Sequence, residues 1–593
     1  MRFQTVTKEF NTSALTFRLE NGTFLILLMD PNFHFPNPKT TVPRERFVQR
    51  ALEMVPGTLS WATLFGMLLL SFFQPVVAAV FVITFDIYWI YRTIFVSYYS
   101  LKGHFTLREG KKINWWERCQ NIEKPAVYAD MIRDRIRQYR EAIQETSIFK
   151  LRDQLVLRKW IFQTKSHLEE VEALIPIQNE ILDWRQIVHV VLLPTAGESA
   201  EIIEPAIQSL LDVNFPKEQM IVVLATEERE NPETRLPKVE YLKKKFDGKF
   251  KDFIVTTHIV EAGEMKCKAS NAAFAARYLM GYFDERHIDY KRVLFSNFDC
   301  DTVAHPEYFA ALTYAFIADP KRLQRAYQPI PVYHNNLWDT NAFVRLAVTG
   351  SSFWHLYQST RREMVTFSSH SESFDTLVKV GFWPLNMISE DSVIYWKCLS
   401  YFNGDYEVKP IHLPVSLDAV LADTYGKTIQ NQYKQLRRWA YGIENWPVTM
   451  RAIWPNPLVP FKTKLRVSFE MLEGHHSWAT TSFILAFLGW LPLVLGGEAF
   501  REGLLAHNLP LVTQTLMTLA MMGMMVSVPL SMVSLPPKPS RYHWTRYSLM
   551  LLQWILAPLV AFLSALPALD SQTRILFGHY FGEFWVTEKV RRK

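Results

Sequence analysis

Long apolar segments near both ends of this 593-residue chain constrain its fold more than any other feature. Residues 58–98 are almost wholly apolar, and three further apolar segments follow a polar centre at 478–495, 509–533 and 547–569. About 20 apolar residues suffice for a helix to cross the hydrocarbon core of a membrane. We therefore expect a membrane protein in which one large polar domain is inserted between membrane segments.

The first apolar segment is too long for one membrane span and is interrupted at Gln74-Pro75. Because proline removes a helix hydrogen bond, we expect a transmembrane hairpin with helices over 58–74 and 76–98. Asp86 lies inside the second helix. A carboxylate within a membrane segment is a candidate for function. The alternative is a structural hydrogen bond to another helix or to the soluble domain.

Polar segments flank these spans. The N-terminal soluble segment, residues 1–57, alternates apolar and polar residues around Asn21-Gly22. This pair favours a type I′ turn, so we expect a small β-hairpin there. Residues 99–185 are charged and helix-like, and we expect a helical interface between the membrane and the central domain. We expect residues 451–477 to form interfacial helices.

The charge distribution gives an orientation for the C-terminal part. After two transmembrane helices over 478–533, the next link and the C-terminal tail are both basic, which places both in the cytosol by the positive-inside rule. Segment 547–569 is therefore not expected to cross the membrane, and Pro558 and Pro567 interrupt it. We expect residues 534–593 to form an interfacial or re-entrant segment instead.

Composition excludes several classes of protein. Hydrophobic residues make up 49% of the chain and charged residues 21%, which excludes a disordered chain. None of the four cysteines forms a C-x-x-C pair, so neither a disulfide framework nor a zinc site is expected. The net charge of +7 comes without a basic run interleaved with aromatic residues, and we expect no nucleic-acid partner.

The polar centre contains short apolar runs without helical period at 189–194, 220–225 and 292–296. Helix-like stretches separate these runs. Strands that alternate with helices indicate a parallel sheet in an α/β domain, which we place at 186–450. In such sheets, ligands bind at the carboxyl ends of the strands.

The third run ends in a pair of aspartates, Asp299 and Asp301. Carboxylates at positions i and i+2 after a strand can reach one ligand site. Hard oxygen ligands suit Mg²⁺ or Mn²⁺, which neutralise a diphosphate leaving group. The alternative is a pair of solvated side chains on a loop.

Two further patterns follow. Glu390-Asp391 begins a helix-like run, and a carboxylate there could act as general base for an acceptor hydroxyl, or could simply be an acidic helix start. Gln435, Arg438 and Trp439 form a Q-x-x-R-W pattern. An indole offers a flat face to a sugar, and a guanidinium binds phosphate in bidentate fashion. The alternative is an amphipathic interfacial helix.

In this order, the D-x-D, E-D and Q-x-x-R-W patterns resemble the family-two glycosyltransferases of the cellulose synthase and hyaluronan synthase type. Residues 584–589, Phe-Trp-Val-Thr-Glu-Lys, match the F-x-V-T-x-K gating-loop motif of bacterial cellulose synthases. The resemblance covers roughly 185–593 and the preceding membrane hairpin. It implies an α/β glycosyltransferase A-type (nucleotide-diphospho-sugar transferase) domain inserted between transmembrane helices.

The resemblance also implies roles for individual residues. Asp391 corresponds to the catalytic base, with Glu390 beside it. Asp299 and Asp301 correspond to the pair that contacts the nucleotide and the metal, Mg²⁺ or Mn²⁺. The donor-binding residues implied are Glu227, Glu228, Lys268, Asp299, Asp301, Arg438, Thr587 and Lys589. The acceptor-binding residues implied are Gln435 and Trp439.

The chain departs from the family pattern after the second strand. The family has Asp-Asp-Gly there, whereas this chain has Thr226-Glu227-Glu228-Arg229. Glu227 or Glu228 takes the place of the aspartate that contacts uridine. This departure leaves the nucleotide base open.

Together these features predict a multi-pass enzyme of the inner membrane with a cytosolic catalytic domain. We expect a metal-dependent, inverting hexosyltransferase that moves a sugar from a nucleotide-diphospho-sugar, such as a UDP-sugar, to a growing polysaccharide. Transfer of one sugar to a lipid acceptor, as in ceramide glucosyltransferases, is the alternative. A non-enzymatic scaffold that kept the fold is a second alternative. Membrane lipid is an expected partner in each case.

Overall fold

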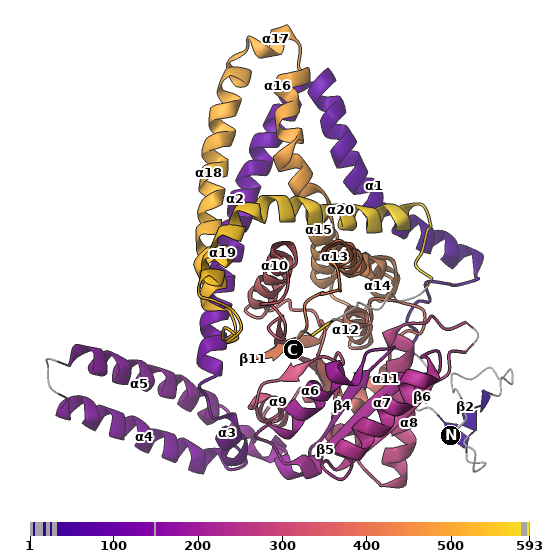
Figure 1. The fold of residues 1–593 in the computed structure, drawn as a ribbon, viewed down its shortest axis with the longest axis vertical. Helices are drawn as coiled ribbons and strands as arrows, with labels where there is room; N and C mark the ends of the chain where they lie inside the picture. Colours follow the sequence, from indigo (N-terminus) through magenta and orange to yellow (C-terminus); the bar gives the residue numbers. More distant parts are fainter. Residues whose placement is uncertain are drawn as a thin grey trace.

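A computed structural model gives the fold of the chain. It describes residues 4–5, 16–18, 24–26, 33–146, 150–261, 263–582 and 590–591. Figure 1 shows an α/β domain at one end of the molecule and long apolar helices at the other. The predicted motif at 584–589, with Thr587 and Lys589, lies outside the described residues.

One mixed sheet forms the centre of the α/β domain. Its strands run in the order β6-β5-β4-β7-β10-β9-β11-β8, with β10 antiparallel to both of its neighbours and β8 antiparallel to β11. The other six strands are parallel to one another. The strand bounds are β4 Val188–Pro194, β5 Met220–Glu227, β6 Asp252–His258, β7 Val293–Asn297, β8 Val303–Ala304, β9 Arg325–Val332, β10 Ser371–Ser373 and β11 Glu407–Ser416.

The central strands are apolar because helices cover both faces of the sheet. Val190 and Leu192 of β4 pack into one hydrophobic cluster, and Val191 and Leu193 pack into another. The first cluster includes α8 Lys268–Glu285, α11 Phe374–Val380 and α12 Glu390–Tyr401. The second includes α6 Ala200–Leu211, α7 Pro232–Phe246 and α9 Tyr308–Ile317. The predicted α/β class, with β4, β5 and β7 as the three predicted strands, is confirmed.

Long apolar helices form the second part of the molecule. Among the described residues, four helices are long and apolar enough to cross a membrane, and a pair bent by 50° would make a fifth. The four are α1 Pro43–Phe73, α2 Pro75–Gly110, α18 Leu504–Val533 and the run Thr545–Leu576, which contains α19 Thr545–Leu552 and α20 Ala557–Leu576. The bent pair is α15 Phe461–Ala486 with the short helices that follow it, the last of which is α16 Leu491–Leu495. The short α17 Glu498–Arg501 leads into α18.

The predicted break at Gln74 is confirmed, but both helices extend beyond the predicted bounds. α1 begins at Pro43 and not at 58, and α2 continues to Gly110 and not to 98. The helical turns outside the predicted bounds contain charged residues. A search for apolar runs does not include such residues, although they form helix here.

The predicted boundary at 478, between interfacial helices and a membrane span, is wrong. α15 runs without a break from Phe461 to Ala486, because neither proline nor a kink interrupts it. The break comes at Phe487, whose backbone leaves the helical region just before Gly489 and Pro492.

Residues 99–185 form helices, as predicted, but do not lie between the membrane helices and the sheet. α4 Pro125–Glu145 and α5 Leu151–Glu172 make an antiparallel hairpin that projects sideways (Figure 1). The short α3 Trp115–Asn121 packs against α9. Tyr128 and Ile132 of α4 join the hydrophobic cluster on one face of the sheet, which holds the base of the hairpin there.

Segment 547–569 lies mostly in α20, which runs crosswise to α1 and α2 (Figure 1). Ser60 of α1 donates to Gln572 at 2.7 Å, and Ser571 donates to the carbonyl of Arg437 at 2.8 Å. This course is the one expected of an interfacial segment, whereas its length and composition would also allow a span. α10 Ala342–Gln358, α13 Tyr425–Ala440 and α14 Asn445–Ile453 lie between the sheet and the long helices.

Near the N-terminus, β2 Thr16–Arg18 pairs antiparallel with β3 Phe24–Ile26, as the hairpin prediction requires. β1 Gln4–Thr5 adds a third strand through its pairing with β2. The predicted turn at Asn21-Gly22 lies outside the described residues.

Candidate active site

Six parallel strands end at the same edge of the sheet, and polar side chains follow several of them. Glu227 closes β5, Asp299 and Asp301 follow β7, and Asp418 follows β11. This edge is where α/β sheets bind ligands. The site predicted from sequence therefore lies where the fold favours one.

Lys268, the first residue of α8, brings three of the predicted carboxylates together. Its Nζ lies 2.8 Å from Asp299 Oδ1, 3.2 Å from Asp391 Oδ1 and 3.4 Å from Glu390 Oε1. Asp299 comes from the D-x-D motif and Glu390 and Asp391 come from the E-D motif, so Lys268 joins two motifs that are far apart in sequence. We call these four side chains the Lys268 cluster.

Burial and charge set the protonation of the cluster. Burial alone would lower the pKa of Lys268, but Asp299, Asp391 and Glu390 together hold it well above its usual value, so the ammonium is charged. Burial, with the neighbouring Asp391, raises the pKa of Glu390. The Glu390 side chain is 5% exposed and the Asp391 side chain 27%. Asp391 is therefore the carboxylate that an acceptor can reach.

The E-D pair is held from two sides. Glu444 accepts hydrogen bonds from the backbone N–H groups of Ile388 and Ser389, at 2.8 and 2.7 Å. The Thr366 hydroxyl donates to the Asp391 carbonyl at 2.6 Å. These contacts fix the start of α12, and sequence analysis identified neither Glu444 nor Thr366.

Asp301 is fully buried beside a second ion pair. Its Oδ2 accepts from the backbone N–H of Asp418 at 2.7 Å. The Asp418 carboxylate accepts from Arg591 Nε at 3.0 Å and from Nη2 at 2.9 Å. Sequence analysis identifies neither partner, because Arg591 belongs to a basic tail without a motif and Asp418 follows an alternating strand without a motif.

The donor atoms at the D-x-D pair fit a divalent metal that is shared with a phosphate ligand. Asp299 and Asp301 supply hard carboxylate oxygens, and Ser368 donates to Asp299 Oδ2 at 2.6 Å. Within the described part of the chain, no group of three or more His, Cys, Asp or Glu side chains could hold a metal by itself. Mg²⁺ in phosphate sites is commonly held by one or two carboxylates and completed by phosphate oxygens and water.

Glu227 and Glu228 have different environments. Glu227 is buried and forms an ion pair with Arg229, and burial raises the pKa of Glu227. Glu228 is exposed, and its backbone N–H donates to the His258 carbonyl at 2.9 Å. Asn271 of α8 donates to the Ala225 carbonyl at 2.9 Å, which ties the end of β5 to the helix that carries Lys268.

The Q-x-x-R-W residues lie on α13. Arg438 acts on the cluster, because its charge opposes the rise in the pKa of Glu390. Gln435 is buried and accepts from Gln432 at 3.3 Å. Trp439 lies against Tyr333, with 6.1 Å between ring centroids. Tyr333 follows β9, so the indole stands near the same edge of the sheet.

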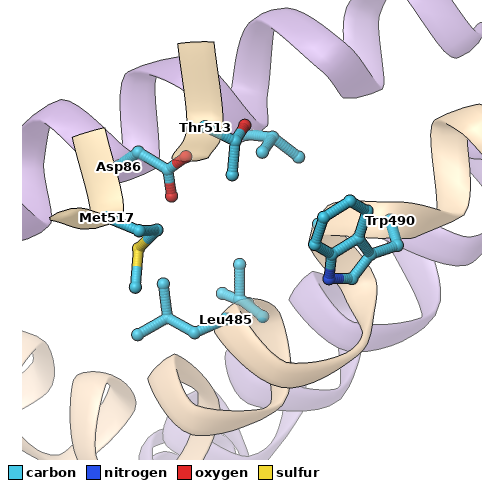
Figure 2. A pocket seen from close by; sticks show the side chains of 8 residues that line it. Asp86, Leu485, Trp490, Thr513 and Met517 are labelled. Carbon is cyan, nitrogen blue, oxygen red and sulfur yellow. The ribbon is translucent and has the colours of Figure 1, made fainter. Parts of the chain in front are cut away.

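Asp86 of α2 lies in a small pocket among the apolar helices. The cavity has a volume of about 50 Å³, and its lining includes Leu485, Trp490, Thr513 and Met517. Figure 2 shows the Asp86 carboxylate facing Thr513 of α18. Asp86 Oδ2 has no hydrogen-bond partner within the described ranges. No charged side chain lines the pocket besides Asp86.

Comparison with known proteins gives partial matches. No family model matches the chain. A poly-β-1,6-N-acetyl-D-glucosamine synthase of Staphylococcus epidermidis is 35% identical over 116 residues, which cover 19% of this chain and 25% of the synthase. The matched part thus spans about a quarter of the length of that relative.

Several solved structures resemble the chain weakly. One is the mannosyltransferase PcManGT from Pyrobaculum calidifontis in complex with GDP-Man and Mn²⁺, at 15% identity, with 58% of this chain and 86% of that chain covered and a TM-score of 0.33. Another is TarS from S. aureus, at 13% identity, with 60% and 57% covered and a TM-score of 0.28. Scores this low carry no argument about chemistry.

Proposed function

We propose that the chain is a membrane-bound, inverting glycosyltransferase that moves a hexosyl group from a nucleotide-diphospho-sugar to a growing polysaccharide. The Lys268 cluster carries this proposal: one ammonium holds carboxylates from the D-x-D and E-D motifs at the carboxyl edge of the sheet. Such a set of groups can bind a nucleotide and activate a hydroxyl in one place.

Asp391 is the catalytic base in this mechanism. It takes the proton from an acceptor hydroxyl, whose oxygen forms a bond to the anomeric carbon while the bond from that carbon to the diphosphate oxygen breaks. The attack is in line, so the anomeric configuration inverts. Glu390 is less suited to this role, because it is buried and its pKa is raised.

The departing diphosphate needs positive charge. Asp299 and Asp301 would hold Mg²⁺ or Mn²⁺, which neutralises the charge that develops on the leaving group. Arg438, whose charge acts on Glu390, would bind the same group through its guanidinium, and Lys268 keeps Asp299 and Asp391 in position. Glu227 or Glu228, at the end of β5, contacts the nucleoside.

Gln435 and Trp439 bind the acceptor. A polysaccharide acceptor is favoured over a lipid because the partial relative is by name a polysaccharide synthase. Thr587 and Lys589, outside the described residues, are proposed to close over the donor. A UDP-sugar is the proposed donor.

The catalytic domain and the C-terminal tail lie on the same side of the membrane in this proposal, and that side is the cytosol of an inner-membrane protein. The Arg591–Asp418 pair supports this arrangement, because it ties the tail to the catalytic edge. A cysteine added after Lys593 should react with an impermeant reagent only from the cytosolic side. Labelling from the outside alone would contradict this orientation.

The decisive experiment is to incubate purified protein with a panel of nucleotide-sugars and Mn²⁺ or Mg²⁺, and to measure nucleotide release and product mass. We expect nucleotide release from one donor, and a ladder of carbohydrate masses in the product. A single added sugar on lipid would favour the alternative acceptor. No release from any donor would overturn the proposed function.

A further inference from the structure

Two buried residues, His370 and Glu372, lie next to Asp391 on its interior side. The mechanism above uses neither of them. His370 Nδ1 lies 3.8 Å from Asp391 Oδ1, and His370 Nε2 lies 3.7 Å from Glu372 Oε1. Both side chains are 1% exposed. The three groups form a line from the catalytic edge into the interior of the sheet.

The local backbone conformation fixes the positions of His370 and Glu372. Ser369 has φ of 66°, in the left-handed region that a residue other than glycine rarely adopts. The Asn297 N–H donates to the His370 carbonyl at 3.0 Å, which joins the turn to the end of β7. Because side chains alternate along a strand, His370 and Glu372 point to the same face as β10 begins.

The contacts of His370 define its tautomer. Nδ1 lies 2.8 Å from the carbonyl oxygen of Phe367, which can only accept, so Nδ1 carries the hydrogen. In the neutral ring, Nε2 is then an acceptor that faces Glu372. Neither carboxyl oxygen of Glu372 has a hydrogen-bond partner within the described part of the chain.

We propose, on the basis of the proposed function, that Glu372 as a neutral acid donates to His370 Nε2 and so fixes the ring with its Nδ1–H edge toward Asp391. That edge is the positive end of the ring dipole and lies 3.8 Å from Asp391 Oδ1, so it helps to hold the Asp391 carboxylate in position. Both residues are positioning residues, because they act on the reaction only through Asp391. The 3.7 Å separation is longer than a hydrogen bond, but catalytic hydrogen bonds often shorten only in the substrate complex.

The protonation states agree with this arrangement. Burial raises the pKa of Glu372 to about 8, and burial lowers the pKa of His370. At pH 7 the carboxyl therefore keeps its proton and the ring is neutral. The other titratable groups that act on Glu372 are Cys398 of α12 and Tyr406, and burial raises the pKa of both, so both are neutral as well.

Two substitutions at Glu372 separate the hydrogen bond from packing. Glu372→Gln keeps a donor for His370 Nε2, whereas Glu372→Met fills a similar volume without one. We expect the Gln variant to stay within about 3-fold of the wild-type kcat, and the Met variant to lose roughly 10- to 100-fold in kcat with the donor KM unchanged, because the orientation of the His370 ring acts on the chemical step. Equal kcat in the two variants, at equal melting temperature, would overturn the proposal.

The pH profile gives a second readout that a packing role would not change. The wild-type kcat should fall as pH rises through about 8, because Glu372 then loses the hydrogen that it donates. The Gln variant cannot ionise, so this fall should be absent. A fall that is the same in both proteins would contradict the assigned role of Glu372.

A third readout does not need catalysis. In protein labelled with ¹⁵N-histidine, His370 is the resonance lost in His370→Asn, and its shift should report the neutral Nδ1–H form at pH 7. The Nε2–H form would overturn the proposal. The Nε2 shift should also change in Glu372→Met, which lacks the donor to Nε2, and an identical shift in both proteins would contradict the Glu372–His370 contact. If the wild type releases no nucleotide, the proposed function fails, whereas this comparison still tests the Glu372–His370 pair.

Discussion

Two buried carboxylate environments in this molecule contrast with each other. In the Lys268 cluster, three carboxylates share one ammonium, and Asp391 remains 27% exposed. In the membrane part, Asp86 is alone among apolar side chains and faces one hydroxyl, that of Thr513. Both carboxylates stand out in the sequence, yet their surroundings differ in charge and in access.

This difference indicates which carboxylate performs chemistry. A proton acceptor must reach its substrate, and Asp391, 27% exposed beside the Lys268 ammonium, meets this requirement. Asp86 has neither a cationic partner in its pocket nor room for a sugar in about 50 Å³. The proposed catalysis therefore belongs to the cluster, and we expect Asp86 to serve helix packing.

The largest expected effect is at Asp391. Asp391→Asn keeps the shape of the side chain but removes the proton acceptor, so kcat should fall roughly 10³-fold, within the usual range for a general base. Donor affinity, measured by calorimetry with the nucleotide-sugar, should stay close to wild type. The control is Asp405→Asn, at an exposed pair with Lys321, which should be fully active. Transfer within a few-fold of wild type would remove Asp391 from the mechanism.

The next effect concerns the metal at the D-x-D pair. Asp301→Ala should weaken donor binding about 100-fold in the presence of Mn²⁺, because a buried carboxylate ligand is lost. Without metal the two proteins should bind the donor equally weakly. Ala at the exposed Asp423 serves as control. Full turnover of the wild type in excess EDTA would show that no metal is needed.

A smaller effect is expected at Arg591. Arg591→Ala leaves the fully buried Asp418 carboxylate without its guanidinium, so we expect roughly a 10-fold rise in the donor KM. Adding Asp418→Asn should recover part of the loss, since the unpaired charge is then gone. Arg574→Ala, at the partly exposed pair with Asp570, is the matched control. Additive effects of the two substitutions would argue against coupling.

Sequence analysis named all four members of the Lys268 cluster, Lys268 through the family resemblance alone, but did not predict that they contact one another. Each member follows a strand or begins a helix. Local patterns mark such positions, and parallel strands bring them to one edge. The Arg591–Asp418 pair could not be predicted, because it joins residues 173 positions apart and neither belongs to a motif. The place of the α4–α5 hairpin was missed for a similar reason: its periodicity predicts helices, but only tertiary packing of Tyr128 and Ile132 decides where they lie.

The smallest expected effect is at Asp86. It tests whether the carboxylate in the apolar pocket takes any part in function. An isolated carboxyl that faces Thr513 in an apolar pocket needs a hydrogen-bonding group there but not a charge. Asp86→Asn should therefore keep transfer within about 2-fold of wild type. Asp86→Leu should also remain active but should have a lower melting temperature, because it leaves the buried Thr513 hydroxyl facing an apolar side chain. Thr513→Val is the matched control on the facing helix. A tenfold loss of transfer in Asp86→Asn, with an unchanged melting temperature, would show that the charge at Asp86 takes part in function.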